Sequence, residues 1–95
     1  MRTLYSDEDI DVSVEEYDEF YEGVFIHTNV KQFSLSKYKK FKHIWTHIRA
    51  GLRLEGYKYV LALPPGDKER KWESMFGFEP TGVFVKGQEI MRVYI

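Results

Sequence analysis

The chain has 95 residues, of which 43% are hydrophobic and 17% aromatic, so we expect a single folded domain over residues 1–95. The absence of cysteine excludes disulfide scaffolds, thiolate zinc sites and cysteine nucleophiles. No apolar run approaches the roughly 18 residues that span a bilayer, and the first residues lack the basic-then-apolar pattern of a secretory signal. We therefore expect a cytoplasmic protein without a membrane segment.

Acidic and basic residues are separated along the chain, although the net charge is only −1. Residues 1–23 carry nine Asp or Glu and one Arg, whereas residues 24–53 carry seven Lys or Arg and no acidic residue. This pattern predicts that the acidic segment folds near the basic one, or that each forms a charged surface. Nucleic-acid binding is the weaker interpretation, because the acidic third would repel phosphates.

The acidic first third of the chain is predicted to form strands. Residues 2–6 have the composition of a short strand, and Ile10, Val12 and Val14 alternate with polar residues, as in a half-buried strand. A helix over residues 14–22 is the alternative, since Ser13 and Glu16 have capping-box spacing. We favour the strand.

A second strand signal leads into the basic part of the chain. Residues 22–30 are rich in β-branched and aromatic side chains, which favour a strand. Residues 34–56 then predict one long amphipathic helix, with Ser34 or Ser36 as its N-cap and Gly56 at its C-terminal end. Its apolar positions recur at spacings of three and four and form one stripe: Leu35, Tyr38, Phe41, Ile44, Trp45, Ile48 and Leu52.

The last third predicts a strand, a short helix and a hairpin. Residues 57–63 form an apolar run typical of a strand that is buried on both faces, and two prolines and a glycine end it. Asp67 is the expected N-cap of a helix over residues 68–76, which Gly77 closes. We expect Trp72, Met75 and Phe76 to point inward on this helix.

Two strands over residues 78–85 and 88–95, joined at Lys86 and Gly87, complete the predicted domain. The fold class is α+β, with a mixed, mostly antiparallel sheet and the element order β-β-β-α-β-α-β-β. Because a strand, a crossing helix and a further strand form a right-handed unit, the strands on either side of the long helix should be parallel neighbours.

Residues 62–82, ALPPGDKERKWESMFGFEPTG, resemble the C-terminal motif of the GNAT family of N-acetyltransferases. In that family a strand and a short helix lead into an x-G-F-x-x-x-G stretch, which residues 77–82 match. Together with the strand and long helix before it, the resemblance spans residues 24–95. The chain also resembles small acetyltransferase-like proteins of bacteriophages, including an internal virion protein with a similar lysine-rich helix.

The GNAT resemblance implies an acyl-CoA cofactor such as acetyl-CoA. It implies that the strand carrying Ile26 and Thr28 aligns the pantetheine arm and that the start of the long helix holds the phosphates. The candidate residues there are Lys31, Ser34, Leu35, Ser36 and Lys37. The glycines of the family's phosphate loop are absent from this stretch.

Two further features depart from the GNAT pattern. Glu73 stands four residues before Gly77, where many family members have a tyrosine that protonates the departing thiolate. It is the candidate catalytic residue, although we expect it to be a solvated surface carboxylate. Only about 30 residues precede the long helix, so a second copy of the chain is one way to complete an acceptor site.

The outward face of the long helix is the candidate partner-binding surface, through Lys39, Lys40, His43 and His47. The two histidines have i, i+4 spacing, but the geometry of the helix places them away from the core and no acidic residue accompanies them, so we expect no metal site. Six aromatic side chains are expected to pack in the core, namely Tyr38, Phe41, Trp45, Trp72, Phe76 and Phe78.

Three hypotheses of function remain from the sequence. The first is a catalytically degenerate acetyltransferase-like domain that binds a protein partner, such as a phage accessory or virion-associated protein, located in the host cytoplasm or the virion. The alternative is an active acyl-CoA-dependent N-acetyltransferase. The third is a nucleic-acid-associated protein that uses the lysines of the long helix on phosphates.

Overall fold

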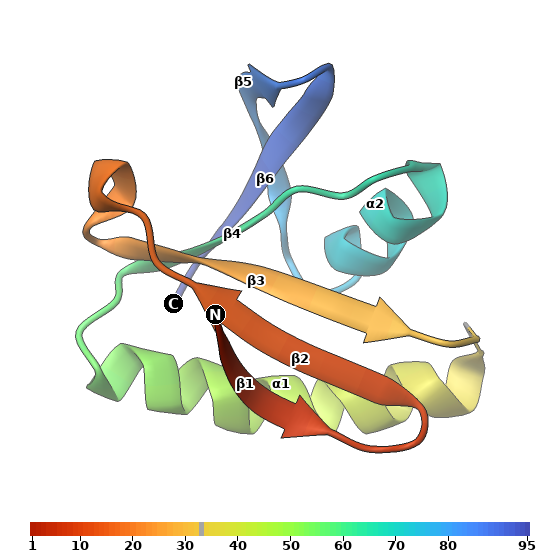
Figure 1. Ribbon diagram of the computed structural model, residues 1–95. Coiled ribbons are helices and arrows are strands. Elements are labelled where there is room, and N and C mark those ends of the chain that lie inside the picture. The colour runs from red at the N-terminus through yellow and green to blue at the C-terminus, as the bar shows by residue number, and fades with distance from the viewer. Residues whose placement is uncertain (33) are drawn as a thin grey trace.

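The computed structural model describes residues 1–32 and 34–95, which form one α+β domain with a mixed sheet (Figure 1). The elements in chain order are β1 (Arg2–Ser6), β2 (Ile10–Glu15), a 3₁₀ turn η1 (Asp18–Phe20), β3 (Gly23–Val30), α1 (Leu35–Leu54), β4 (Tyr59–Ala62), α2 (Asp67–Ser74), β5 (Glu79–Val85) and β6 (Gln88–Tyr94). Apart from η1, this order of strands and helices is the predicted one. The fold class is therefore confirmed.

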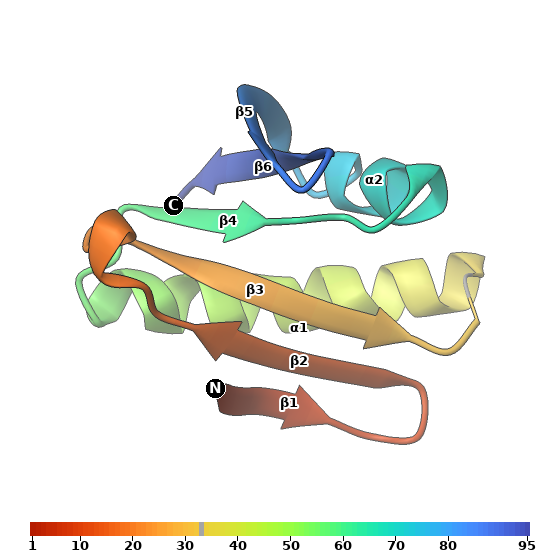
Figure 2. The ribbon, with the colours of Figure 1, turned by 45° about the horizontal axis from the view of Figure 1, so that its top comes forward.

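The strands lie in the order β1-β2-β3-β4-β6-β5, which Figure 2 shows from the side of the sheet that α1 does not cover. All neighbours are antiparallel except β3 and β4, which are parallel, as predicted for the strands that flank α1. The parallel ladder is short, because it runs only from Gly23 opposite Tyr59 to Phe25 opposite Leu61.

Helix α1 covers one face of the sheet through most of the predicted apolar stripe. Ser34 is the N-cap, as predicted, since its hydroxyl accepts a hydrogen bond from the Lys37 amide, and Gly56 has the left-handed φ of 99°. Leu35 was expected in the stripe but is 68% exposed. It is the first residue of the helix, one turn before the helix reaches the core at Tyr38 and Phe41.

The aromatic side chains of α1 and α2 pack against each other on this face. Phe41 lies edge-on to Phe76 with ring centroids 4.8 Å apart, and Tyr38 contacts both Trp72 and Phe76. These contacts confirm the prediction that the aromatic residues build the core. On the opposite face a smaller cluster, centred on Phe25, Leu61 and Ile90, packs against Phe20 of η1.

Helix α2 departs from the sequence prediction at two positions. Asp67 is its first residue rather than its N-cap, which is Gly66, and no side-chain hydrogen bond caps this end. Met75 is 52% exposed, because the helix ends at Ser74 and the chain turns at Gly77, with φ 92°, to bring Phe76 and Phe78 inward instead.

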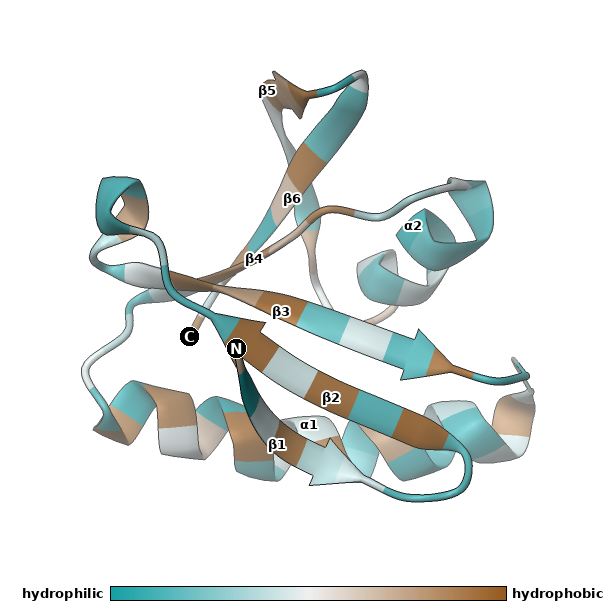
Figure 3. Cartoon of the chain, in the orientation of Figure 1, coloured by the Kyte–Doolittle hydropathy of each residue, from teal (hydrophilic) through white to brown (hydrophobic). Residues whose placement is uncertain are grey.

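The predicted turns and the strand assignment of the first third are confirmed. Residues 10–15 form β2 with Ile10, Val12 and Val14 buried against α1, so the alternative helix over residues 14–22 is wrong except for the short turn η1. Figure 3 shows the alternation of apolar and polar residues along β2. Lys86 and Gly87, with φ of 51° and 81°, make the tight β5–β6 turn.

The acidic segment does fold against the basic helix, as one of the two sequence interpretations predicted. The Lys40 ammonium lies 2.5 Å from an Asp7 carboxylate oxygen, and Lys37 lies 3.6 Å from Asp9. Both carboxylates belong to the turn between β1 and β2. In the part of the chain that the structure describes, no helix is long and apolar enough to cross a membrane.

Gly23 provides a test of the close packing at the parallel ladder. A Cβ atom on Gly23 would lie 2.1 Å from a ring carbon of Tyr59, so Gly23→Ala forces this ring to move. We expect the free energy of unfolding, measured by urea denaturation, to fall by about 1–3 kcal/mol. Gly51→Ala in α1 is the control, since a Cβ there meets no heavy atom within 4 Å and should stabilise the helix by about 0.5–1 kcal/mol. Equal losses in the two variants would contradict this account.

Candidate ligand-binding cleft

A cleft opens where β3 and β4 part. Their pairing ends at Phe25 and Leu61, after which β3 continues to Val30 while the chain after β4 turns away into α2 (Figure 2). The cleft has a volume of about 370 Å³, within the usual range for small-molecule sites. It is lined by residues 26–30 of β3, by Leu63 and Pro65 after β4, and by Glu69, Trp72 and Glu73 of α2.

Two prolines explain why the strands part. Pro64 and Pro65 follow Leu63, and proline has no backbone N–H to continue a ladder with β3. Gly66 then starts α2, which carries its carboxylates to the wall of the cleft. The pairing with β4 therefore ends at Phe25, and the last five residues of β3, residues 26–30, have no partner in β4.

Glu73 is not the solvated surface carboxylate that the sequence suggested. Its side chain is largely buried, and its Oε2 atom has no hydrogen-bond partner among the described residues. Burial, and then the charge of Glu69, raise the pKa of Glu73 to about 8. The neighbouring cation on α2, Arg70, is paired with Glu89 of β6 at 2.7 Å. A pKa of about 8 favours the protonated form of Glu73 at neutral pH.

A second hollow of about 420 Å³ lies between the start of α1 and α2. Ser34, Leu35 and Tyr38 line it from α1, and Lys68, Lys71 and Trp72 line it from α2. Since Trp72 borders both hollows, they are adjacent. A helix N-terminus beside two lysines favours an anionic group, because the backbone amides and the helix dipole add to the lysine charges.

The structure does not bring the predicted cofactor residues together at one site. Some of them line the cleft, some line the second hollow, and the others line neither. Ile26 and Thr28 line the cleft, and Ser34 and Leu35 line the second hollow. Ser36 lies at the helix start with its hydroxyl 3.2 Å from that of Ser34.

The two predicted phosphate-binding lysines make other contacts. The Lys37 side chain lies beside Asp9, and the Lys31 side chain is exposed while its backbone amide donates to the Asp9 carbonyl. Phe33, within the predicted phosphate loop, lies outside the described residues.

The predicted partner-binding residues lie on the other side of α1, away from the cleft. Lys40, His43 and His47 border a groove of about 620 Å³ between β1 and α1, which we call the β1–α1 groove, and Lys39 is exposed beside it. The His43 and His47 rings lie 4.9 Å apart and point away from the core. Among residues 1–32 and 34–95, no group of three His, Asp or Glu side chains could hold a metal ion.

His27 and Asn29 also line the cleft and were not predicted as site residues. They alternate with Ile26 and Thr28 along β3, so their side chains project from the sheet face opposite α1. The alternation was visible in the sequence. The position of the cleft was not, because it depends on where α2 meets β3.

Comparisons with known proteins show the fold alone. No protein-family model and no curated protein matches the chain. The chain is similar to the crystal structure of a domain from Methanocaldococcus jannaschii DSM 2661, with a TM-score of 0.69, 19% sequence identity and coverage of 98% of this chain. It spans 63% of the length of that chain. The α+β architecture is thus shared with a solved structure.

The raised pKa of Glu73 predicts a specific pH dependence of stability. Between its ordinary value of 4.5 and about 8, the folded state binds a proton that the unfolded state has lost, so stability falls as the pH rises through this window. We expect Glu73→Gln to flatten this decline and to be about 1–3 kcal/mol more stable than the wild type at pH 8.

Urea denaturation at pH 5, 6, 7 and 8 measures this effect. Glu79→Gln, an exposed position on β5, is the matched control and should keep the wild-type dependence. A Glu73→Gln variant that keeps the same decline would show that Glu73 is ionised in the folded protein.

Proposed function

We propose that the protein is a small GNAT-like N-acyltransferase that binds an acyl-CoA in the β3–β4 cleft and transfers the acyl group to an amine. The observation that carries this proposal is the Glu73 carboxyl, which lines the cleft and whose Oε2 atom is buried without a hydrogen-bond partner among the described residues. Glu73 stands four residues before Gly77, where the family resemblance implies a general acid. A group that holds a proton at pH 7 and can release it near pH 8 suits protonation of a leaving thiolate.

The arrangement of the sheet supports the resemblance. The GNAT resemblance implies a strand and a long helix, and then a strand, a short helix and two final strands, and the elements β3 to β6 follow in this order. The exposed edge of β3 beyond Phe25 offers backbone amides to a pantetheine arm. Ile26 and Thr28 face the same cleft.

The second hollow suits the phosphates of such a donor. Lys68 and Lys71 lie across from Ser34 at the start of α1, so they supply positive charge in place of the family's glycine loop. When bound, the donor supplies an activated thioester. Glu73 holds the proton for its sulfur, and the walls of the cleft position the acyl group.

Binding of a protein partner without catalysis is the second candidate function, as in phage accessory or virion proteins of the host cytoplasm. The mainly apolar β1–α1 groove, with His43 and His47 at its border, favours this candidate. Nucleic-acid binding has less support, because Lys37 and Lys40 are paired with Asp9 and Asp7.

Calorimetric titration with acetyl-CoA, followed by thiol release with a panel of primary amines, tests the proposed function. We expect binding in the micromolar range and a turnover that falls above about pH 8, as Glu73 loses its proton. Glu73→Gln should lower kcat by about 100-fold and change the acetyl-CoA affinity by less than about twofold.

Charge reversal tests the phosphate site separately. The double variant Lys68→Glu and Lys71→Glu should weaken acetyl-CoA binding by at least about tenfold, whereas Lys86→Glu, in the exposed β5–β6 turn that lines neither hollow, should not. No heat of binding at millimolar acetyl-CoA would contradict the proposed function and favour the partner-binding candidate.

A further inference from the structure

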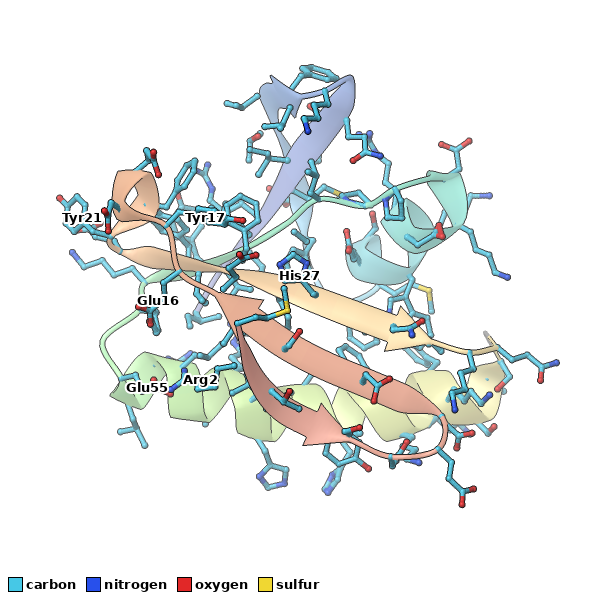
Figure 4. All side chains as sticks on the ribbon, in the orientation of Figure 1. Arg2, Glu16, Tyr17, Tyr21, His27 and Glu55 are labelled. Carbon is cyan, nitrogen blue, oxygen red and sulfur yellow. The ribbon has the colours of Figure 1, made fainter. Side chains whose placement is uncertain are left out.

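A histidine and a carboxylate are paired at the mouth of the cleft. His27 Nε2 lies 3.1 Å from Glu15 Oε1, and both side chains are partly exposed. Figure 4 shows His27 on the sheet face opposite α1. Ser13 is the residue directly opposite His27 in the antiparallel β2–β3 ladder, so Glu15 reaches His27 diagonally. His27 also lines the cleft, and Glu15 does not.

Glu15 is held in its ionised form by two neighbours. The hydrogen bond from the Tyr17 hydroxyl, and then the contact with His27, lower the pKa of Glu15. An ionised carboxylate only accepts hydrogen bonds, so the imidazole nitrogen that faces it carries the hydrogen. This assigns the Nε2–H tautomer to neutral His27 and leaves the lone pair on Nδ1.

We infer that His27 Nδ1 accepts the proton of the acceptor amine, and that Glu15 and Tyr17 are the positioning residues that fix the imidazole tautomer. This inference rests on the proposed function. The amine would enter from the sheet face opposite α1, where His27 and Asn29 border the cleft. Glu73 on α2 borders the other wall, so a proton acceptor and a proton donor share one cleft.

The charges around His27 also define the acceptor. Glu15 on β2 faces it directly, Tyr17 follows on the same side, and Glu69 and Glu73 approach the cleft from α2. The N-terminal ammonium adds a smaller positive charge near Glu15, outside the cleft. No Lys or Arg is among the described residues that line the cleft. The site therefore favours an aliphatic amine that arrives as a cation, and disfavours amines that carry a carboxylate or phosphate.

The proton balance of the step is complete. The acceptor enters as an ammonium ion and releases one proton to solvent. As the C–N bond forms, His27 Nδ1 takes the second proton, and Glu73 gives its proton to the sulfur as the C–S bond breaks. A proton then passes through solvent from the imidazolium to the Glu73 carboxylate, which restores both groups.

Substitution of the pair tests this assignment. We expect His27→Gln to lower kcat by about 100-fold, with little change in acetyl-CoA affinity. Glu15→Gln should lower kcat by about tenfold and Glu15→Asp should restore part of it. Glu19→Gln, on the exposed turn η1, is the control and should behave as the wild type.

A long-range ¹H–¹⁵N spectrum provides a readout that does not depend on turnover. It should show the hydrogen of neutral His27 on Nε2 in the wild type, and a mixture of tautomers in Glu15→Gln. A hydrogen on Nδ1 in the wild type would overturn the inference.

The kinetic outcomes separate the inference from the proposed function. If acetyl-CoA binds and turns over but His27→Gln retains the wild-type kcat within about threefold, the inference alone fails. If acetyl-CoA binds but no amine is acylated, the catalytic role of His27 also fails. If acetyl-CoA does not bind, the proposed function fails and the inference fails with it.

Discussion

The parallel pairing of β3 and β4 is the constraint on which the candidate site depends. It lasts for three residue pairs, packed tightly where Gly23 meets the ring of Tyr59, and then stops because Pro64 and Pro65 remove the backbone donors that a longer ladder needs. Since α1 spans the parting strands on one face only, the gap remains open toward the other face. α2 then fills one side of this gap with polar side chains.

Charge separation along the chain has a structural use in this fold. The β1–β2 turn brings Asp7 and Asp9 to the basic face of α1, and the hydrogen bonds from Lys40 and the Tyr5 hydroxyl hold the pKa of Asp7 well below its usual range. These contacts attach the N-terminal hairpin to the helix. They also pair Lys37 and Lys40, which the sequence had offered to phosphates, with carboxylates of the β1–β2 turn.

Most of the fold was predictable because periodicity and turn chemistry are local properties. The alternation in β2, the Ser34 cap, the left-handed glycines at 56 and 77 and the Lys86–Gly87 turn were all found from residue type and spacing. The failures at Leu35, Asp67 and Met75 all occur at helix ends. At a helix end the apolar spacing of the sequence still fits a helix, but the direction of the chain beyond the helix decides which side chain is buried.

The sequence by itself determined the element order, the apolar faces and the position of Glu73 four residues before Gly77, since each depends on spacing along one segment. It did not determine the burial of Glu73 or the contact that His27 makes. Burial of the Glu73 carboxyl arises where α2 meets the end of β3, and the His27–Glu15 contact arises from the register of β2 and β3. Such pairings join residues far apart in the chain, so only the tertiary structure could bring the Glu73 carboxyl and the His27 imidazole to one cleft.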